Sequence, residues 1–221
     1  MRGRSESTLK ILYIGNSFTA RNNLPGLLAQ LAASRGKEIK HRLISAGGAS
    51  LRRHWNAAMA REAIAKGGYD HVVLQEQSTL PVKNASRMHE SVRLFDEEIK
   101  KAGAKTVLYM TWARRHSPQA QEAISDAYTS IGREIGAIVV PVGLAWRDFL
   151  SKHDEPVLHD RDQSHPTLAG SYLAACVFVA VLLKENPVGI KTEVAGLNAR
   201  EQALLQKSAW QSCRAATKEQ H

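Results

Sequence analysis

The sequence predicts an α/β protein, a three-layer α/β/α sandwich around a parallel sheet of five strands. Short apolar segments alternate with longer amphipathic ones, and four of the amphipathic segments end at glycine. Alternating strands and helices favour parallel strands that are joined by right-handed crossovers. We expect the strand order 2-1-3-4-5, with the switch point beside the first strand.

The expected strands are short, and the third and fifth are mostly apolar, as in a sheet that is covered on both faces. They are 10–14, 38–44, 71–75, 106–111 and 137–142. The expected helices are 24–35, 51–66, 85–102, 118–134, 167–185 and one within 198–216. The first four helices are followed by Gly36, Gly67, Gly103 and Gly136, which are typical helix stop signals.

The chain of 221 residues is long enough to bury the core of one generous domain. It contains no internal repeat, no low-complexity tract and no long linker. We therefore expect a single domain over 1–221, with its core at about 8–190 and a C-terminal helical tail at 191–221.

Composition argues against several classes of protein. No apolar run reaches the roughly 18 to 20 residues that a membrane span needs. The start, MRGRSESTLK, is basic but lacks the apolar core and cleavage site of a signal peptide. We expect a cytoplasmic protein without a membrane span; a processed or edited N-terminus would permit a secreted form.

The charge is basic, with 30 Lys and Arg against 21 Asp and Glu, a formal +9. The charges are spread without a polybasic block or interleaved aromatic residues, so we expect no specific nucleic-acid partner. The two cysteines make neither a disulfide framework nor a metal cluster. Cys176, in an apolar helical run, is expected to be core packing.

The stretch KILYIGNSFTA ends an apolar strand in the polar turn Gly15-Asn16-Ser17. Such a serine can cap a helix, or it can present a nucleophile at the edge of the sheet. Asn23 lies nearer the next expected helix and is the better candidate for its cap.

The carboxyl ends of parallel strands meet at one edge, so the residues after each strand can be considered together. They are Ser17, then Gly47 and Gly48, then the run QEQS at 75–78, then Trp112, and finally HDRDQSHPT at 159–167. In that last loop Asp162 precedes His165 by three residues, a spacing at which the carboxylate can bond the Nδ1–H of the imidazole. The free Nε2 could then take a proton from Ser17, which predicts a nucleophile, a base and an orienting acid.

These motifs resemble those of the SGNH (GDSL-like) hydrolase superfamily, serine esterases on a flavodoxin-like sheet. IGNSFT is similar to the nucleophile block, with Asn16 in place of the commoner Asp. GGAS resembles the second block, which implies that the Gly48 N–H binds the oxyanion. DQSH matches the Asp-x-x-His block, and the resemblance runs in order from residue 10 to about 185.

The third block departs from the usual Gly-x-Asn-Asp, because this chain has Gln75-Glu76-Gln77-Ser78. It resembles the glutamine-containing block of some carbohydrate acetylesterases, and a glutamine amide can also donate to an oxyanion. If the strand continued, Gln75 and Gln77 would share a face. Gln75, at the end of the strand, is the preferred donor.

Several side chains allow a structural or a functional interpretation. Trp112 is either core or a substrate platform. His54 and His89 are expected on helix surfaces, and Arg114 and Arg115 on the rim of the site, where they would favour anionic substrates. The remaining histidines and aspartates of the last loop match no zinc spacing, so we expect no metal, and the esterase chemistry needs no cofactor.

The predicted function is hydrolysis of carboxylic esters through an acyl-enzyme, possible substrates including acetyl esters of carbohydrates. Lipase or thioesterase activity on acyl chains stays open. The alternative is a catalytically silent module that binds acidic polysaccharide or nucleic acid. The sequence predicts no oligomeric state.

Overall fold

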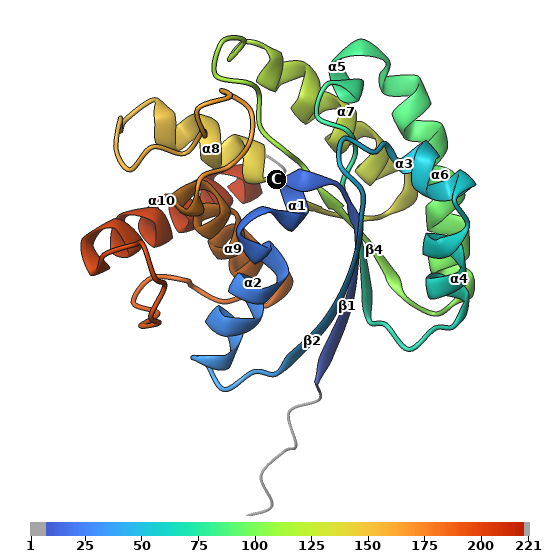
Figure 1. Cartoon of the computed structure of the whole chain (residues 1–221), viewed down its shortest axis with the longest axis horizontal. Helices are drawn as coiled ribbons and strands as arrows, with labels where there is room; N and C mark the ends of the chain where they lie inside the picture. Colours follow the sequence, from blue (N-terminus) through green and yellow to red (C-terminus); the bar gives the residue numbers. More distant parts are fainter. Residues whose placement is uncertain (1–7, 219–221) are drawn as a thin grey trace, which may run out of the picture.

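The computed structural model describes residues 8–218 of the chain, with five parallel strands as its middle layer (Figure 1). The predicted fold class is confirmed, since the strand order is β2-β1-β3-β4-β5. The strands are β1 Leu9–Gly15, β2 Ile39–Ser45, β3 His71–Leu74, β4 Lys105–Tyr109 and β5 Ile138–Val140. The start of the chain, on which the expectation about a leader peptide rested, lies largely outside the described residues.

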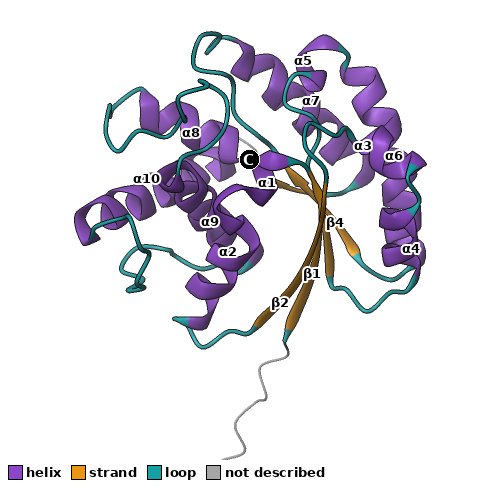
Figure 2. Ribbon diagram, in the orientation of Figure 1, coloured by secondary structure: helices purple, strands orange, loops and turns teal. Residues whose placement is uncertain are grey.

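Helices cover both faces of the sheet, as the purple ribbons on either side of the orange strands show (Figure 2). One face carries α1 Ser17–Ala20, α2 Leu24–Ala33, α8 Val142–Leu150, α9 Leu168–Leu182 and α10 Ala199–Lys218. The other carries α3 Leu51–Asn56, α4 Met59–Ala65, α5 Leu80–Lys83, α6 Ala85–Lys101 and α7 Ala120–Ile135. The short 3-10 turn η1, Arg21–Asn23, joins α1 to α2. None of the helices within residues 8–218 is long and apolar enough to cross a bilayer.

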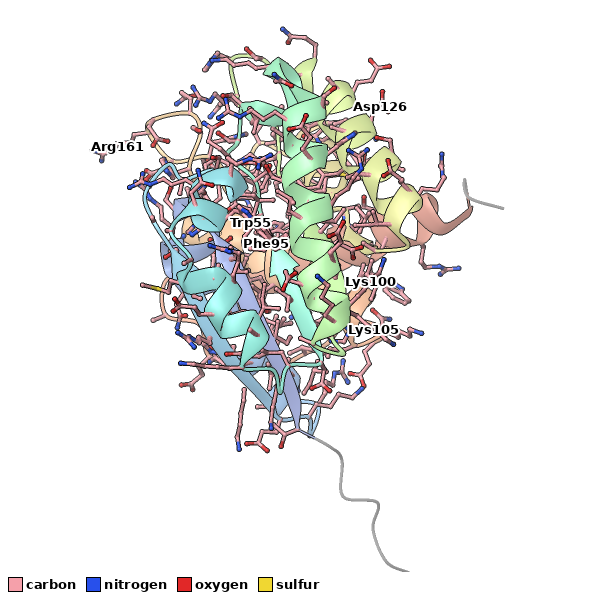
Figure 3. All side chains as sticks on the ribbon, turned by 90° about the vertical axis from the view of Figure 1, so that its right-hand side faces the viewer. Trp55, Phe95, Lys100, Lys105, Asp126 and Arg161 are labelled. Atoms are coloured by element: carbon pink, nitrogen blue, oxygen red, sulfur yellow. The ribbon has the colours of Figure 1, made fainter. Side chains whose placement is uncertain are left out.

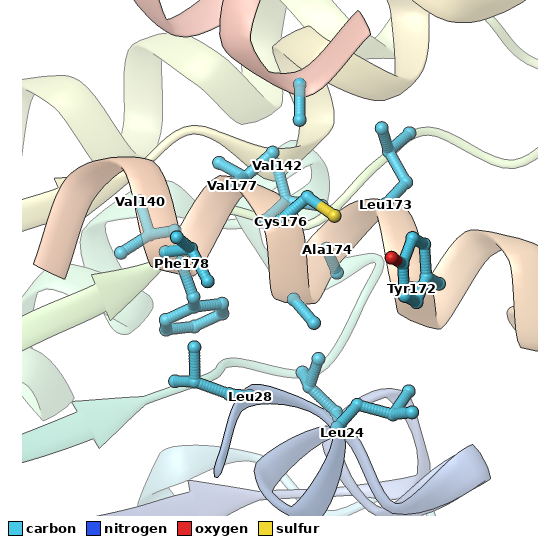
Figure 4. Close-up of a cluster of buried hydrophobic side chains, with 14 of the residues drawn as sticks. Leu24, Leu28, Val140, Val142, Tyr172, Leu173, Ala174, Cys176, Val177 and Phe178 are labelled. Atoms are coloured by element: carbon cyan, nitrogen blue, oxygen red, sulfur yellow. The ribbon is translucent and has the colours of Figure 1, made fainter. Parts of the chain in front are cut away.

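The first core lies between the sheet and α9, a helix that is buried on every side between α2, α10 and the strands. An all-round apolar helix is expected at such a place. In Figure 4, Leu24 and Leu28 of α2 lie across from Phe178 and Cys176 of α9. Cys176 is fully buried, which confirms its expected packing role.

The second core fills the space between the other face of the sheet and α3, α4, α6 and α7. Trp55 of α3 meets Phe95 of α6 edge to face, with ring centroids 5.2 Å apart (Figure 3). Successive strand residues serve the two cores in turn: Tyr13 faces the first core, and Leu12 and Ile14 face the second.

Strand register brings the carboxyl ends together. Gly15 pairs with Ser45 of β2, and Ile14 pairs with Leu74 of β3. The segments that follow β1, β2 and β3 therefore begin at one edge of the sheet, as the sequence predicted.

The predicted helix 51–66 is two helices, α3 and α4. They are separated at Ala58, whose φ of 63° and ψ of −36° lie outside the helical region. The segment contains neither glycine nor proline, so local propensity favours one continuous helix. Tertiary packing overrides it, because Trp55 turns into the second core and Arg61 lies over its ring.

The predicted fifth strand, 137–142, is longer than the observed one. β5 ends at Val140, and Pro141, which has no N–H for a ladder, precedes a helix that the sequence analysis missed. The signal for α8 was present: Val142, Ala145, Trp146 and Phe149 follow helical spacing, and all four are buried.

Candidate active site

The turn after β1 begins a helix. Asn16 has extended backbone angles and is the N-cap of α1: its Oδ1 accepts a hydrogen bond from the Phe18 N–H at 3.0 Å. Ser17 is the first residue of that helix, so Ser17 is not the cap. Asn23 caps α2, with its side chain accepting from the Gly26 N–H, as expected.

Gly15 permits a close approach of the third strand's end to the turn. A Cβ on Gly15 would lie 2.6 Å from the Gln75 Oε1 and 2.8 Å from the Thr19 Oγ1. Any larger residue would push these groups apart, and the Gln75 oxygen is the acceptor for the Asn16 N–H at 2.8 Å. The glycine thus fixes the place of the turn that carries Ser17.

The loop before α9 is closed by its own backbone. The Asp160 N–H donates to the His165 carbonyl at 2.8 Å, and His159 and Pro166 form an antiparallel bridge. The loop is anchored to η1 by an Arg21–Asp160 ion pair at 2.6 Å. The Asn22 amide adds a hydrogen bond to the Pro166 carbonyl. Arg161, at the loop's outer edge, points away from the ribbon (Figure 3).

This arrangement brings Ser17, His165 and Asp162 together. The Ser17 Oγ lies 2.8 Å from the His165 Nε2, and the His165 Nδ1 is hydrogen-bonded to the Asp162 Oδ2. An ionised carboxylate only accepts, so Nδ1 carries the proton and Nε2 accepts the Ser17 hydroxyl. The edge of the His165 ring also packs on Phe18, with centroids 5.3 Å apart.

Asp162 is held as a carboxylate. Desolvation acts to raise its pKa, but the hydrogen bonds from the His165 N–H, the His165 side chain and the Ser164 N–H outweigh this effect. The pKa of Asp162 therefore lies well below its usual range.

Two backbone N–H groups, those of Ser17 and Gly48, lie in the segments that follow β1 and β2. Gly48 has a φ of 62°, which favours glycine, and a Cβ there would meet nothing within 4 Å. Neither the Gly48 N–H nor the Ser17 N–H donates to another group among the described residues. The Asn16 Nδ2 donates to the Ala49 carbonyl at 3.1 Å and so ties the two turns together.

Gln75 does not serve as the expected oxyanion donor, and this prediction is wrong. Its side chain is fully buried and its amide nitrogen donates to the Glu76 carbonyl. Its oxygen accepts from the Asn16 N–H and from the Thr19 hydroxyl. The amide therefore holds the turn that carries Ser17 from its buried side.

Gln77 does not share a strand face with Gln75, because β3 ends at Leu74. The Gln77 Oε1 accepts from the N–H and hydroxyl of Thr79 and from the Leu80 N–H. The side chain shapes the turn before α5, and its amide nitrogen donates to no group among the described residues.

Trp112 is core and not a substrate platform, which corrects its place among the expected binding residues. It is 1% exposed and its ring is stacked between Phe18 at 4.8 Å and Trp146 at 3.7 Å. Its indole N–H donates to the Ser164 carbonyl at 3.0 Å. Trp112 thereby supports both Phe18 and the loop that carries His165.

His54 is buried, so the expectation of a surface residue is wrong. Its Nε2 lies 2.7 Å from the Gly15 carbonyl, to which it donates, and burial lowers its pKa. Its position three residues after Leu51, on the inner face of α3, was the signal for this role. His89 is half-buried, with its Nε2 on the Ala127 carbonyl.

Glu76 is the functional residue that the sequence analysis missed. It is fully buried, and its Oε1 accepts from the Leu51 N–H at 3.1 Å and the Gln77 N–H at 2.6 Å. Burial raises the pKa of Glu76 to about 7. The carboxyl group joins the start of α3, just after the Gly48 turn, to the third block.

The histidines near the site have separate tasks. The His159 Nε2 donates to the Ala113 carbonyl at 3.0 Å, and its Nδ1 faces the Trp146 indole N–H. His153 packs on Phe149. Within the part of the chain that the structure describes, no three His, Cys, Asp or Glu side chains are grouped to hold a metal ion.

Fold and site together define a doubly wound α/β protein with a Ser-His-Asp arrangement at the carboxyl edge of its sheet. A solved structure of a candidate SGNH hydrolase from Slackia heliotrinireducens is 30% identical to the chain, with a TM-score of 0.69. The match covers 80% of this chain and 100% of that one. The protein belongs to the SGNH hydrolase family.

Two more distant structures share the fold. A DUF4886 family protein from Bacteroides uniformis is 20% identical, with a TM-score of 0.74, and the match covers 95% of this chain and 96% of that one. The psychrotrophic esterase EstA from Pseudoalteromonas sp. is 14% identical, with a TM-score of 0.62 and coverage of 79% and 97%. No family model matches the sequence, and no curated protein matches it significantly.

Proposed function

We propose that the protein hydrolyses carboxylic esters through an acyl-enzyme on Ser17. The observation that carries this proposal is the 2.8 Å contact between the Ser17 Oγ and the His165 Nε2, with His165 oriented by Asp162. A serine hydroxyl becomes a useful nucleophile when such a base accepts its proton.

In the first half-reaction, the Ser17 Oγ attacks the ester carbonyl while its proton moves to the His165 Nε2. Asp162 stabilises the imidazolium through Nδ1–H. The tetrahedral intermediate collapses, the C–O bond to the alcohol breaks, and His165 returns the proton to the leaving oxygen. Water then repeats the sequence on the acyl group, releasing the acid and regenerating Ser17.

The oxyanion of both intermediates needs donors that are already in place. The unused N–H groups of Ser17 and Gly48 are the proposed pair, and the Gln77 amide nitrogen is the proposed third donor. A single donor of this kind typically contributes about 3 to 4 kcal/mol to transition-state stabilisation.

The finer assignment, an acetylesterase that acts on carbohydrate, rests on the glutamine-containing block alone. Because Gln75 is committed behind the nucleophile turn, it adds no contact to a substrate. The assignment is tested with acetylated sugars beside acyl esters of graded chain length. Turnover that falls from acetyl to longer chains, and that is highest on sugars, supports it; the reverse order contradicts it in favour of a lipase or thioesterase.

The reaction itself is tested with 4-nitrophenyl acetate and a fluorophosphonate probe. We expect turnover and covalent labelling at Ser17, both abolished by Ser17→Ala. His165→Ala should slow labelling severely, and Asp162→Ala somewhat less, since the orienting acid is usually the least costly member to lose. Ser45→Ala, at the end of the neighbouring strand, is the control and should label normally.

Two results would overturn the proposal. Labelling at a serine other than Ser17 would remove its nucleophile. A folded protein that is never labelled, hydrolyses no ester and binds polyanions in low salt would instead fit the silent binding module.

A further inference from the structure

A cavity lies between α8, the start of α7 and the loop that follows β4. Its volume is about 280 Å³. Apolar surface comes from Trp146, Leu150, Pro118 and Ala113, and three arginine side chains complete the lining: Arg114, Arg115 and Arg147.

The cavity is separate from the proposed catalytic residues. Neither Ser17 nor His165 lines it. Between them stands a layer of aromatic rings: His165 packs on Phe18, Phe18 stacks on Trp112, and Trp112 stacks on Trp146, which is itself a wall of the cavity. Both ring stacks are within 7° of parallel, so the layer is closely packed.

Two of the three arginines that line this cavity have no ion-pair partner among the described residues. No acidic side chain is among its lining residues. Arg114 and Arg115 make no ion pair with any carboxylate among the described residues, and Arg147 pairs only with its neighbour Asp148, at 3.2 Å. The Asp148 carboxylate also accepts a hydrogen bond from the Ser212 hydroxyl.

Arg114 has one polar atom without a partner. Its Nε is buried and has no hydrogen-bond acceptor among the described residues. A buried N–H without an acceptor is costly, and native proteins rarely leave one unused. The side chains of His159 and Gln121 in the wall are already engaged: the His159 Nε2 donates to the Ala113 carbonyl, and Gln121 accepts from the Ala113 N–H and donates to the Thr111 carbonyl.

We propose that this cavity binds a small organic anion: a carboxylate or phosphate group received by Arg114, on a flat apolar body that packs against Trp146 and Leu150. Guanidinium groups suit both oxyanions, because their N–H groups match the oxygen geometry in pairs. The volume admits one aromatic ring or a short chain, and a few polar groups on an apolar wall are typical of small-molecule sites.

The test is direct binding, measured by calorimetry and by the shift of the Trp146 indole N–H resonance. The probes are benzoate, phenyl phosphate, the neutral benzyl alcohol and inorganic phosphate. Both aromatic anions are expected to bind at least tenfold more tightly than benzyl alcohol, and their ratio assigns the preferred head group. The resonance of Trp146 should move with each of them.

Variants separate charge from packing. Arg114→Gln should weaken binding of both aromatic anions by about tenfold or more, as expected for loss of a charge-assisted hydrogen bond. Leu150→Gln should weaken the aromatic anions several-fold and leave inorganic phosphate unchanged. Arg133→Gln, an exposed arginine in the last turn of α7, is the matched control and should leave every affinity unchanged.

Independence from the catalytic site is tested on protein whose Ser17 is replaced by alanine or blocked by the fluorophosphonate. Binding of the anions should be unchanged in both. Equal affinity for benzyl alcohol, equal losses in R114Q and R133Q, or loss of binding when Ser17 is blocked would each overturn the proposal. None of these readouts depends on ester hydrolysis, so failure of the proposed function leaves the test valid.

Discussion

Asn16 holds the turn that carries Ser17 through both the oxygen and the nitrogen of its amide. The oxygen accepts from the Phe18 N–H, and the nitrogen donates to the Ala49 carbonyl. The aspartate that is commoner in related motifs could keep only the first of these bonds. It would also set a carboxylate against a carbonyl oxygen, so Asn16 is suited to this particular pair of turns.

The buried carboxyl group of Glu76 should make the free energy of unfolding depend on pH. Burial raises its pKa in the folded protein to about 7, above the value near 4.5 of an exposed glutamate. Between about pH 4.5 and 7, only the folded state holds the proton. The contribution of Glu76 to the free energy of unfolding is therefore complete below about pH 4.5 and is lost as the pH rises through about 7. The total loss is on the order of 3 kcal/mol.

Urea unfolding of the wild type and of Glu76→Gln between pH 4.5 and 8 measures this effect. The glutamine stays neutral and keeps an oxygen for the Leu51 and Gln77 N–H groups, so the variant should gain on the wild type as the pH rises. Glu62→Gln, on the exposed side of α4, is the control and should follow the wild type. A stability difference between E76Q and wild type that is constant over the range would contradict the assignment.

At the scale of elements, the break between α3 and α4 shows where local patterns stop being informative. The run from Leu51 to Lys66 has the composition of one helix, and nothing in it marks Ala58 as a break. The observed backbone at Ala58, with φ of 63°, is one that glycine adopts at a lower cost than alanine.

Ala58→Gly should therefore stabilise the protein, by about 1 kcal/mol, because it removes backbone strain at this residue. Ala57→Gly is the matched control: Ala57 has helical angles as the C-cap of α3, so glycine there should destabilise by roughly 0.5 to 1 kcal/mol. Thermal or urea unfolding of the two variants decides the point. A loss of stability in both would mean that the break is not strained.

Part of the fold and of the candidate site could be predicted from the sequence, and part could not. The sheet order followed from alternating segments, and the meeting of Ser17, Asp162 and His165 followed from strand ends at one edge. The hydrogen bonds of Gln75, His54 and Glu76 depend on how the loops pack against one another in three dimensions. Short sequence motifs do not predict this packing. The helix α8 could have been predicted, because the residues after Pro141 have helical spacing. The sequence analysis missed it because it extended the fifth strand to residue 142.

For the whole molecule, the formal charge of +9 should favour the approach of anionic esters. We expect kcat/KM for 4-acetoxybenzoate to fall several-fold as salt rises from 10 to 200 mM, where the Debye length shrinks from about 30 Å to below 10 Å. The neutral methyl 4-acetoxybenzoate, with the same acetyl group, should change little. Parallel salt curves for the two esters would show that the surface charge does not steer substrates.

The bonds that join the three strand-end turns mostly end on backbone atoms. Asn16 reaches the Ala49 carbonyl, His54 the Gly15 carbonyl, and Glu76 the N–H groups of Leu51 and Gln77. Every residue except proline offers such an N–H, and every residue offers a carbonyl. During evolution, side chains at the receiving positions can therefore be exchanged without loss of these bonds. The surface around Ser17 can therefore change to suit other substrates while the position of Ser17 stays the same, provided that Asn16, His54 and Glu76 are retained.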